Sequence, residues 1–342
     1  MKLPKTRAPK FRGGFFMKPK KHQALLLLSG GLDSLLAAKI LLAQNIKVFG
    51  LIFKSCFFSA EKSKSAAEQL GIPYQVIDFS EKHLKIIKNP PHGRGKAANP
   101  CIDCHLLMLK HAKKLLEKGS FNFVATGEVL GERPFSQNKQ ALDLIAKESG
   151  LKDRLLRPLS AKLFSPTLPE KKGWVNRDKL MAIQGRQRHI QIKLAKKYKL
   201  TYPQPAGGCI LCEPEFAKKL FELFDKWPKC SGEDIKLLFL GRHFWHPAKS
   251  RTRKFRFAKA SFAGRGALAT KIVLGKNEEE NEKLAKLAQK GNLIIEPANF
   301  PGPTALIRGE KITSQTIKKA KSLILTYSKK QSTSPTFSET QK

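Results

Sequence analysis

The sequence predicts an α/β fold built on a doubly wound parallel sheet, because strand-like and helix-like segments alternate through its first half. Five short apolar segments have the character of buried strands, and four segments between or after them have the character of helices. The strand segments are residues 24–28, 48–53, 74–79, 121–126 and 155–159, and the helical segments are residues 34–43, 61–70, 102–117 and 137–148. Ligands of such sheets bind at the carboxyl ends of the strands.

A change of composition around residues 228–232 predicts a second, smaller α+β domain. Two helical segments precede this change, a basic one at residues 176–199 and an amphipathic one at residues 216–227. A strand-like segment follows at residues 271–274. The predicted organisation is a basic disordered arm at residues 1–22, a nucleotide-binding α/β domain at residues 23–228, a basic C-terminal domain at residues 229–327 and a disordered tail at residues 328–342.

The chain is strongly basic. Its 342 residues include 65 Lys and Arg against 27 Asp and Glu, which gives a formal net charge of +38. An excess this large attracts polyanions, so RNA or DNA is the first partner to expect. Six cysteines in a chain of this length do not indicate a disulfide-stapled secreted domain, and the sequence contains neither a secretory signal nor 18 consecutive apolar residues. We therefore expect a cytoplasmic protein with no membrane partner.

The most informative motif is the loop Ser-Gly-Gly-Leu-Asp-Ser at residues 29–34, between the first strand and the first helix. Free backbone N–H groups and the helix dipole favour an anion at such a place, and glycine lets the backbone approach it closely. Serine hydroxyls can donate to phosphate, and Asp33 can hold a Mg²⁺ ion bound to it. The residues expected to bind phosphate here are Ser29, Gly30, Gly31, Asp33 and Ser34.

A second loop is expected to face the same nucleotide. Thr126 and Gly127 follow the fourth strand, whose carboxyl end lies at the same edge of the predicted sheet. Neither the Walker A pattern nor the Gly-x-Gly-x-x-Gly dinucleotide turn is present. The six-residue motif is instead similar to the pyrophosphate loop (PP-loop) of ATP pyrophosphatases, enzymes that cleave ATP to AMP and pyrophosphate.

Four cysteines form two Cys-x-x-Cys pairs, Cys101 with Cys104 and Cys209 with Cys212. A helix N-terminus after Pro100 would lower the pKa of the first pair and favour the thiolate. Three interpretations remain open: a [4Fe–4S] cluster with one open iron, a persulfide or disulfide cycle in which Cys104 and Cys209 face each other, and a structural zinc site. The cluster ranks first, the persulfide second and zinc third.

The basic residues also include candidates for RNA contact. In the first domain these are Arg133, which follows the fourth strand, and Arg186 and Arg188, which lie in the basic helical segment. In the second domain, Arg242 and Lys254 lie in clusters where basic and aromatic residues are interleaved, a pattern typical of RNA surfaces.

Read together, the motifs resemble the sulfur-inserting branch of the PP-loop superfamily, and in particular tRNA 4-thiouridine synthases and tRNA-specific 2-thiouridylases. The signatures are Asn-Pro-Cys-x-x-Cys-His at residues 99–105, Ala-Thr-Gly-Glu-x-x-Gly-x-Arg-Pro-x-Ser-Gln at residues 125–137 and Pro-Ala-Gly-Gly-Cys at residues 205–209. The resemblance covers roughly residues 23–224. The additional Cys101, which the 2-thiouridylases lack, matches the iron–sulfur-dependent thiolases and is the reason that the cluster ranks first.

The resemblance implies an ATP pyrophosphatase-type tRNA sulfurtransferase. Such an enzyme adenylates a uracil carbonyl oxygen, releases pyrophosphate and then inserts sulfur with release of AMP, giving 4-thiouridine or 2-thiouridine. Cys104, Cys209 and Asp33 would be catalytic, with ATP, Mg²⁺ and a [4Fe–4S] cluster as cofactors and with Cys101, Cys104, Cys209 and Cys212 as metal ligands. The partners would be tRNA and a sulfur donor, which is sulfide, a cysteine desulfurase or a sulfur carrier protein.

Two other functions compete with this one. The first is an adenylating ligase or amidotransferase that acts on a small molecule, and the cysteine pairs and the charge of +38 disfavour it. The second is an RNA-binding protein with a vestigial ATP site, which the intact loop at residues 29–34 disfavours.

Overall fold

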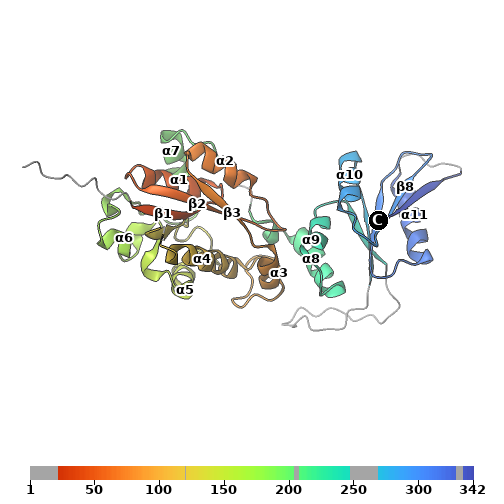
Figure 1. Ribbon diagram of the computed structural model, residues 1–342, viewed down its shortest axis with the longest axis horizontal. Helices are drawn as coiled ribbons and strands as arrows, with labels where there is room; N and C mark the ends of the chain where they lie inside the picture. Colours follow the sequence, from red (N-terminus) through yellow and green to blue (C-terminus); the bar gives the residue numbers. More distant parts are fainter. Residues whose placement is uncertain (1–21, 120, 204–207, 247–268, 329–333) are drawn as a thin grey trace, which may run out of the picture.

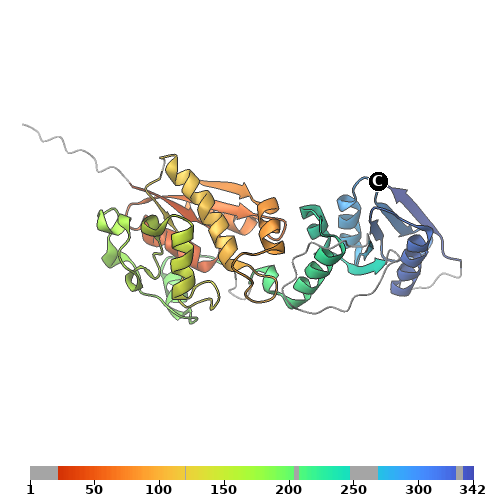
Figure 2. The same cartoon turned by 90° about the horizontal axis from the view of Figure 1, so that it is seen from below.

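The computed structural model describes residues 22–119, 121–203, 208–246, 269–328 and 334–342. Figures 1 and 2 show two lobes that lie end to end, each built on one sheet. Helices α8 (Pro214–Lys226) and α9 (Gly232–Leu237) lie between the two sheets (Figure 1).

The first sheet is parallel, with strand order β3-β2-β1-β4-β5. This order, which runs outward in both directions from β1, is that of a doubly wound fold and confirms the predicted fold class. All five predicted strand segments form strands: β1 (Gln23–Leu27), β2 (Lys47–Lys54), β3 (Tyr74–Asp78), β4 (Phe123–Ala125) and β5 (Leu155–Leu156).

Helices cover both faces of this sheet because successive side chains of a strand point to opposite faces. Leu26 of β1 packs into a core with helices α1 (Leu32–Leu42), α2 (Glu61–Leu70) and α7 (His189–Lys197). The adjacent Leu25 packs into a second core on the other face, with the helices α4 (Cys101–Glu117) and α5 (Lys139–Glu148). Figure 2 shows α4, in gold, lying across that face.

A third core joins the two lobes. Helix α3 (Ser80–Lys88), which the sequence analysis did not anticipate, contributes Leu84 and Ile87 to it. Helices α8 and α9 supply Leu220 and Ile235 from either side of the predicted boundary at residue 228, so this core does not divide there. Of the short elements, α6 (Leu168–Lys171), η1 (Lys152–Arg154), η2 (Ala161–Leu163) and η3 (Arg177–Lys179) lie between β4 and α7, and η4 (Ile210–Cys212) precedes α8.

The second sheet is antiparallel, with strand order β10-β8-β9-β7-β6. Its core contains Ile272, Ile295 and Ile307, together with Ile324 of helix α11. The elements are β6 (Arg242–His246), β7 (Thr270–Leu274), α10 (Glu278–Leu287), β8 (Leu293–Pro297), β9 (Ala305–Arg308), α11 (Ser314–Tyr327) and β10 (Phe337–Gln341). A smaller α+β domain was predicted here, and the sheet with its helices is of that class.

Two sequence expectations are corrected. The helix predicted at residues 176–199 is restricted to α7, because Gly185 has a φ of +84° and its N–H donates to the carbonyl of Leu130, which ties this segment to the loop after β4. The predicted disordered tail contains β10, whose residues pair with β8 along its length. In the described part of the chain, no helix is long and apolar enough to span a membrane.

Candidate functional site

The loop between β1 and α1 is held in shape by its own polar groups. Ser34 Oγ donates to the carbonyl oxygen of Gly31 at 2.8 Å, and the hydroxyls of Ser29 and Ser34 are 3.3 Å apart. Gly30 has a φ of +75°, and a Cβ atom there would lie 2.6 Å from the carbonyl oxygen of Lys62. Glycine is therefore required at position 30 both by its conformation and by the space available.

The loop after β4 packs directly on the first loop, as the sequence predicted. A Cβ atom on Gly127 would lie 2.6 Å from both the carbonyl carbon of Asp33 and the amide nitrogen of Ser34. The two backbones can approach this closely only because residue 127 has no side chain. The contact fixes the carboxyl end of β4 against the N-terminus of α1.

Asp33 lies in an ion-pair network with Arg188 and Glu132. Arg188 Nη2 is 3.0 Å from Asp33 Oδ2 and also contacts Glu132 Oε1. Burial, reinforced by the charge of Glu132, raises the pKa of Asp33 to about 6, although Arg188 acts in the opposite direction. The other carboxylate oxygen, Oδ1, is buried and has no hydrogen-bond partner among the described residues. An acceptor of this kind, beside the loop at residues 29–34, fits a cation such as Mg²⁺.

Glu128 is buried next to this loop and forms hydrogen bonds with three side chains. Its Oε2 accepts hydrogen bonds from Arg157 Nε at 2.8 Å and from Thr126 Oγ1 at 3.0 Å, and its Oε1 is 2.6 Å from His105 Nδ1. Burial raises the pKa of this carboxyl, but Arg157 and His105 lower it more, so its pKa lies well below the usual range. The network links His105, next to Cys104 on α4, to the end of β4.

The structure brings the two cysteine pairs together at the N-terminus of α4. Asn99 Nδ2 donates to Cys212 Sγ at 2.8 Å, and the N–H of Ala98 donates to the carbonyl of Leu211. These bonds tie the segment before α4 to η4, over a hundred residues later. The pairs are close enough for Cys209 to raise the pKa of Cys104 and for Cys212 to raise the pKa of Cys101.

The thiols differ from expectation in their protonation. Burial raises the pKa of Cys104 well above that of an ordinary thiol and raises the pKa of Cys209 to about 11. The predicted lowering at a helix N-terminus is therefore wrong, since the desolvation of a thiolate outweighs the helix dipole here. The thiols are protonated at neutral pH, so a neighbouring base is needed to produce the nucleophile.

His83 of α3 is that neighbour, and the sequence analysis missed it. Its Nε2 lies 2.9 Å from Cys104 Sγ, and its ring stacks on Phe79 with centroids 4.6 Å apart. Burial lowers the pKa of His83 to about 4, so the ring is neutral at pH 7 and its Nε2 can accept a hydrogen bond from the Cys104 thiol. The position of His83, one turn into an amphipathic helix after β3, was visible in the sequence, but its pairing with Cys104 depends on the tertiary fold.

Comparison with known proteins identifies the first lobe. Residues 20–162 match the family model of the thiamine biosynthesis protein (ThiI). This part of the chain is therefore similar to the ThiI family. The matched residues contain both loops, Cys101 and Cys104, whereas Cys209 and Cys212 lie beyond the match. Residues 265–339 match a second family model, the NFACT protein RNA binding domain, which spans β7 to β10.

The curated relatives agree with this placement. A tRNA-specific 2-thiouridylase from Symbiobacterium thermophilum is 29% identical over 143 residues, which are 34% of this chain and 36% of that protein. Another, from Synechocystis sp., is 25% identical over 63% of this chain and 62% of that protein. The chain spans about a third of the length of the first curated relatives that it matches.

A solved structure, the predicted subunit of tRNA methyltransferase from Methanocaldococcus jannaschii, has a TM-score of 0.35 at 15% identity, covering 52% of this chain and 76% of that chain.

The five arginines and lysines predicted to bind RNA lie in different surroundings. Arg133 is exposed and close enough to influence Asp33 and Cys209. Arg188 is bound by Asp33 and Glu132, beside the loop at residues 29–34. Arg186 is exposed, Arg242 stacks over the ring of Tyr327, and Lys254 lies outside the described residues.

Proposed function

We propose that this chain is a tRNA sulfurtransferase, which activates a uracil carbonyl with ATP and replaces its oxygen by sulfur. One observation carries the proposal: a continuous path of contacts connects the phosphate loop to the cysteines. Gly127 packs on Asp33, and the next residue, Glu128, binds His105, the neighbour of Cys104. The site that holds ATP and the site that holds sulfur would thus be adjacent, so that one uracil base can react first with ATP and then with the sulfur. A tRNA substrate agrees with the predicted cytoplasmic location.

In the first proposed step, the loop at residues 29–34 holds the pyrophosphate portion of ATP. The uracil oxygen attacks the α-phosphorus, a new O–P bond forms, and pyrophosphate leaves. Backbone N–H groups at the start of α1 stabilise the charge that develops on the leaving group. Asp33 and its unpartnered Oδ1 would hold Mg²⁺, whose charge adds to this stabilisation. Arg133, exposed beside Asp33, is placed to contact phosphate or the RNA backbone.

In the second step, a persulfide on Cys104 supplies the sulfur. Its terminal sulfur attacks the adenylated ring carbon, and AMP leaves with the former carbonyl oxygen. The thiol of Cys209 then attacks Cys104 Sγ, which forms a Cys104–Cys209 disulfide and releases the thiolated base. A persulfide-bearing donor and a thiol reductant restore the starting state. When the donor reloads Cys104, His83 Nε2 is placed to accept a hydrogen bond from its thiol.

A [4Fe–4S] cluster is the second candidate for the sulfur-bearing group, and the gathering of four thiols favours it. As placed, the side chains do not converge on a metal: among the residues that the structure describes, no three His, Cys, Asp or Glu residues form a set that could hold one. We therefore derive no step through a cluster. Anaerobic purification followed by an absorbance scan near 400 nm tests it. A colourless, iron-free and fully active enzyme excludes the cluster, and a colourless enzyme with stoichiometric zinc favours the zinc site.

Gly127→Ala is expected to lower the ATP-dependent rate by on the order of 100-fold, because its Cβ would push the phosphate loop away by part of an ångström. Pyrophosphate release at saturating tRNA measures the effect. Gly232→Ala, where the φ is not positive and an added Cβ would make only an ordinary contact at 3.4 Å with Cys56, is the control for replacing a glycine elsewhere. Equal rates for the two variants would show that the close contact does not matter.

The proposed function is tested by ATP–pyrophosphate exchange with and without tRNA. We expect exchange only when tRNA is present, since the uracil oxygen is the group that attacks ATP. Exchange without RNA would contradict the proposal and favour a small-molecule ligase. Exchange under neither condition would favour an RNA-binding protein with a vestigial ATP site. Mass analysis of tRNA nucleosides from cells that lack the protein then identifies the product as 2-thiouridine or 4-thiouridine.

A further inference from the structure

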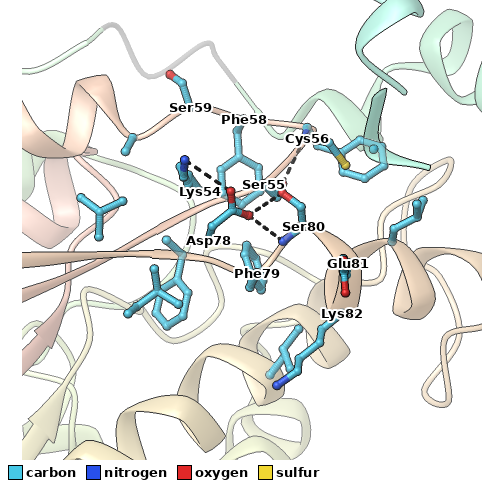
Figure 3. Close-up of a pocket in the computed structure, with 18 of the residues that line it drawn as sticks. Lys54, Ser55, Cys56, Phe58, Ser59, Asp78, Phe79, Ser80, Glu81 and Lys82 are labelled. Carbon is cyan, nitrogen blue, oxygen red and sulfur yellow. Dashed lines mark hydrogen bonds and ion pairs between the residues drawn. The ribbon is translucent and has the colours of Figure 1, made fainter. Parts of the chain in front are cut away.

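A large open groove of about 1580 Å³ lies at the carboxyl ends of β2 and β3, with Cys56 and Cys230 in its lining. Helices α3 and α4 form one wall, and α9 closes the end nearest the second lobe. Figure 3 shows Phe58 and Phe79 near the ion pair of Lys54 with Asp78, and Lys82 lower in the view. The groove is distinct from the phosphate loop, because its lining includes no residue of the segment 29–34.

Lysines without acidic partners line the wall of this groove. Lys82 and Lys85 of α3 and Lys110 and Lys114 of α4 are all exposed, and none of the ion pairs between described residues includes any of them. Other lysines of the lining are neutralised, such as Lys54, which pairs with Asp78 at 3.3 Å. The wall therefore carries uncompensated positive charge.

His111, which lies on α4 within this groove, responds to that charge. Its pKa is lowered by partial burial and then by the charges of Lys82, Lys114 and Lys118. No acidic group is among the causes of this shift. The lining also contains Glu81 and Glu233, but lysines outnumber the acidic residues, and such an excess of positive charge is typical of a polyanion-binding surface.

Two aromatic rings in the groove are exposed to solvent. Phe58 is 38% exposed, and its ring packs edge-on against His83 at 5.6 Å. Phe239, which follows α9, is 44% exposed and lies 5.0 Å from Phe216. Exposed aromatic rings within a basic groove provide stacking platforms for unpaired bases.

The groove leads to the sulfur site. The ring of Phe58 packs edge-on against His83, and Nε2 of His83 lies 2.9 Å from Cys104 Sγ. Along α4, Lys110 follows Cys104 by six residues, which is about 9 Å of helix. A strand bound along these lysines would thus pass within a few nucleotides of Cys104.

We propose that this groove binds a single-stranded segment of the substrate RNA, with phosphates on the lysines of α3 and α4 and bases stacked on Phe58 and Phe239. The inference rests on the proposed function, because it assigns the surface that presents the tRNA to Cys104. An acidic protein would use the same lysines but would have no need of exposed rings between them, so RNA is the better fit.

The test compares RNA binding by two double variants of equal charge. Lys110→Glu with Lys114→Glu alters the groove, and Lys47→Glu with Lys152→Glu makes the same change at the opposite edge of the sheet, where both lysines are exposed. Fluorescence anisotropy with bulk tRNA, in the absence of ATP, is expected to show at least tenfold weaker binding for the groove variant than for the control. The slope of the logarithm of the binding constant against the logarithm of the salt concentration should fall in magnitude by about 1.4, since two phosphate contacts are lost.

A second variant tests stacking. Phe58→Ala is expected to weaken binding of single-stranded oligouridine about tenfold and to leave binding of a duplex of equal length unchanged. The inference is overturned if the groove and control variants bind tRNA equally, or if Phe58→Ala weakens duplex binding as much as single-strand binding. It is also overturned if the groove variant keeps tRNA binding but loses sulfur uptake from its donor, which would make the groove a protein-docking surface.

These measurements separate the groove from the proposed reaction. Binding without ATP reports on the groove even if no thiolated nucleoside is ever formed. If thiolation does occur, the groove variant should recover its rate at saturating tRNA, and a loss that persists there would contradict a binding role.

Discussion

Cys104→Ser should lower tRNA thiolation by on the order of 1000-fold or more while tRNA-dependent pyrophosphate release continues. A serine hydroxyl cannot carry a persulfide, so the sulfur-bearing nucleophile is removed and the later step fails. The adenylation step uses the loop at residues 29–34, which does not include Cys104. The measurement is a pair of rates on one preparation: pyrophosphate released, and thiolated nucleoside detected by mass spectrometry.

Cys230→Ala is the matched control for this prediction. Cys230 is buried in the core that contains Phe224 and Ile235, and it belongs to neither Cys-x-x-Cys pair. We expect it to retain thiolation after any loss of stability is taken into account by thermal unfolding. A Cys104→Ser enzyme that thiolates tRNA as fast as Cys230→Ala would disprove the assigned role.

Arg157→Met is expected to lower the free energy of unfolding by about 3–5 kcal/mol, because it leaves Glu128 charged and buried without its strongest partner. Methionine preserves most of the side-chain volume, so the loss reports on charge more than on packing. Arg154→Met, three residues earlier and exposed, should change the same quantity by less than about 0.5 kcal/mol. Urea unfolding at pH 7 measures both, and equal values would contradict the role given to this ion pair.

The same pair predicts a dependence on pH. The pKa of Glu128 is depressed in the folded state, so its stabilising contribution is present above the usual carboxyl pKa of 4.5 and is lost as the pH falls toward the folded value. The difference in unfolding free energy between the wild type and Arg157→Met should therefore shrink as the pH is lowered below about 4.5. A difference that stayed constant from pH 7 to pH 3 would rule out this origin.

Local sequence patterns were enough to predict the framework of the first lobe. Each strand of the parallel sheet is a short apolar run, and the loop at residues 29–34 is continuous in sequence, so neither depends on distant residues for its recognition. Gly127 was predicted to face the same nucleotide as this loop, because the carboxyl ends of parallel strands share one edge. The contact between Gly127 and Asp33 shows that the two loops meet at that edge, and the binding of a nucleotide there stays a prediction.

Interactions between distant segments were beyond the sequence. Arg188 lies 155 residues from Asp33, and nothing in its neighbourhood distinguishes it from the other basic residues around α7. The pairing of His83 with Cys104 required the unpredicted α3. The thiol pKa values were misjudged because a helix N-terminus is visible in sequence, whereas the burial of the thiols is not.

The core that joins the two lobes holds them at a set distance from each other. Leu84 and Ile87 of α3 pack with α8, and Trp227 at the end of α8 donates through Nε1 to the carbonyl of Ala269 just before β7, the first strand of the matched RNA-binding domain. Helix α8 has 13 residues and is therefore about 20 Å long. If the second sheet held an RNA, the nucleotide that reaches Cys104 would lie at one set distance along the RNA from the bound segment. The choice of uridine would then depend on this distance as well as on sequence.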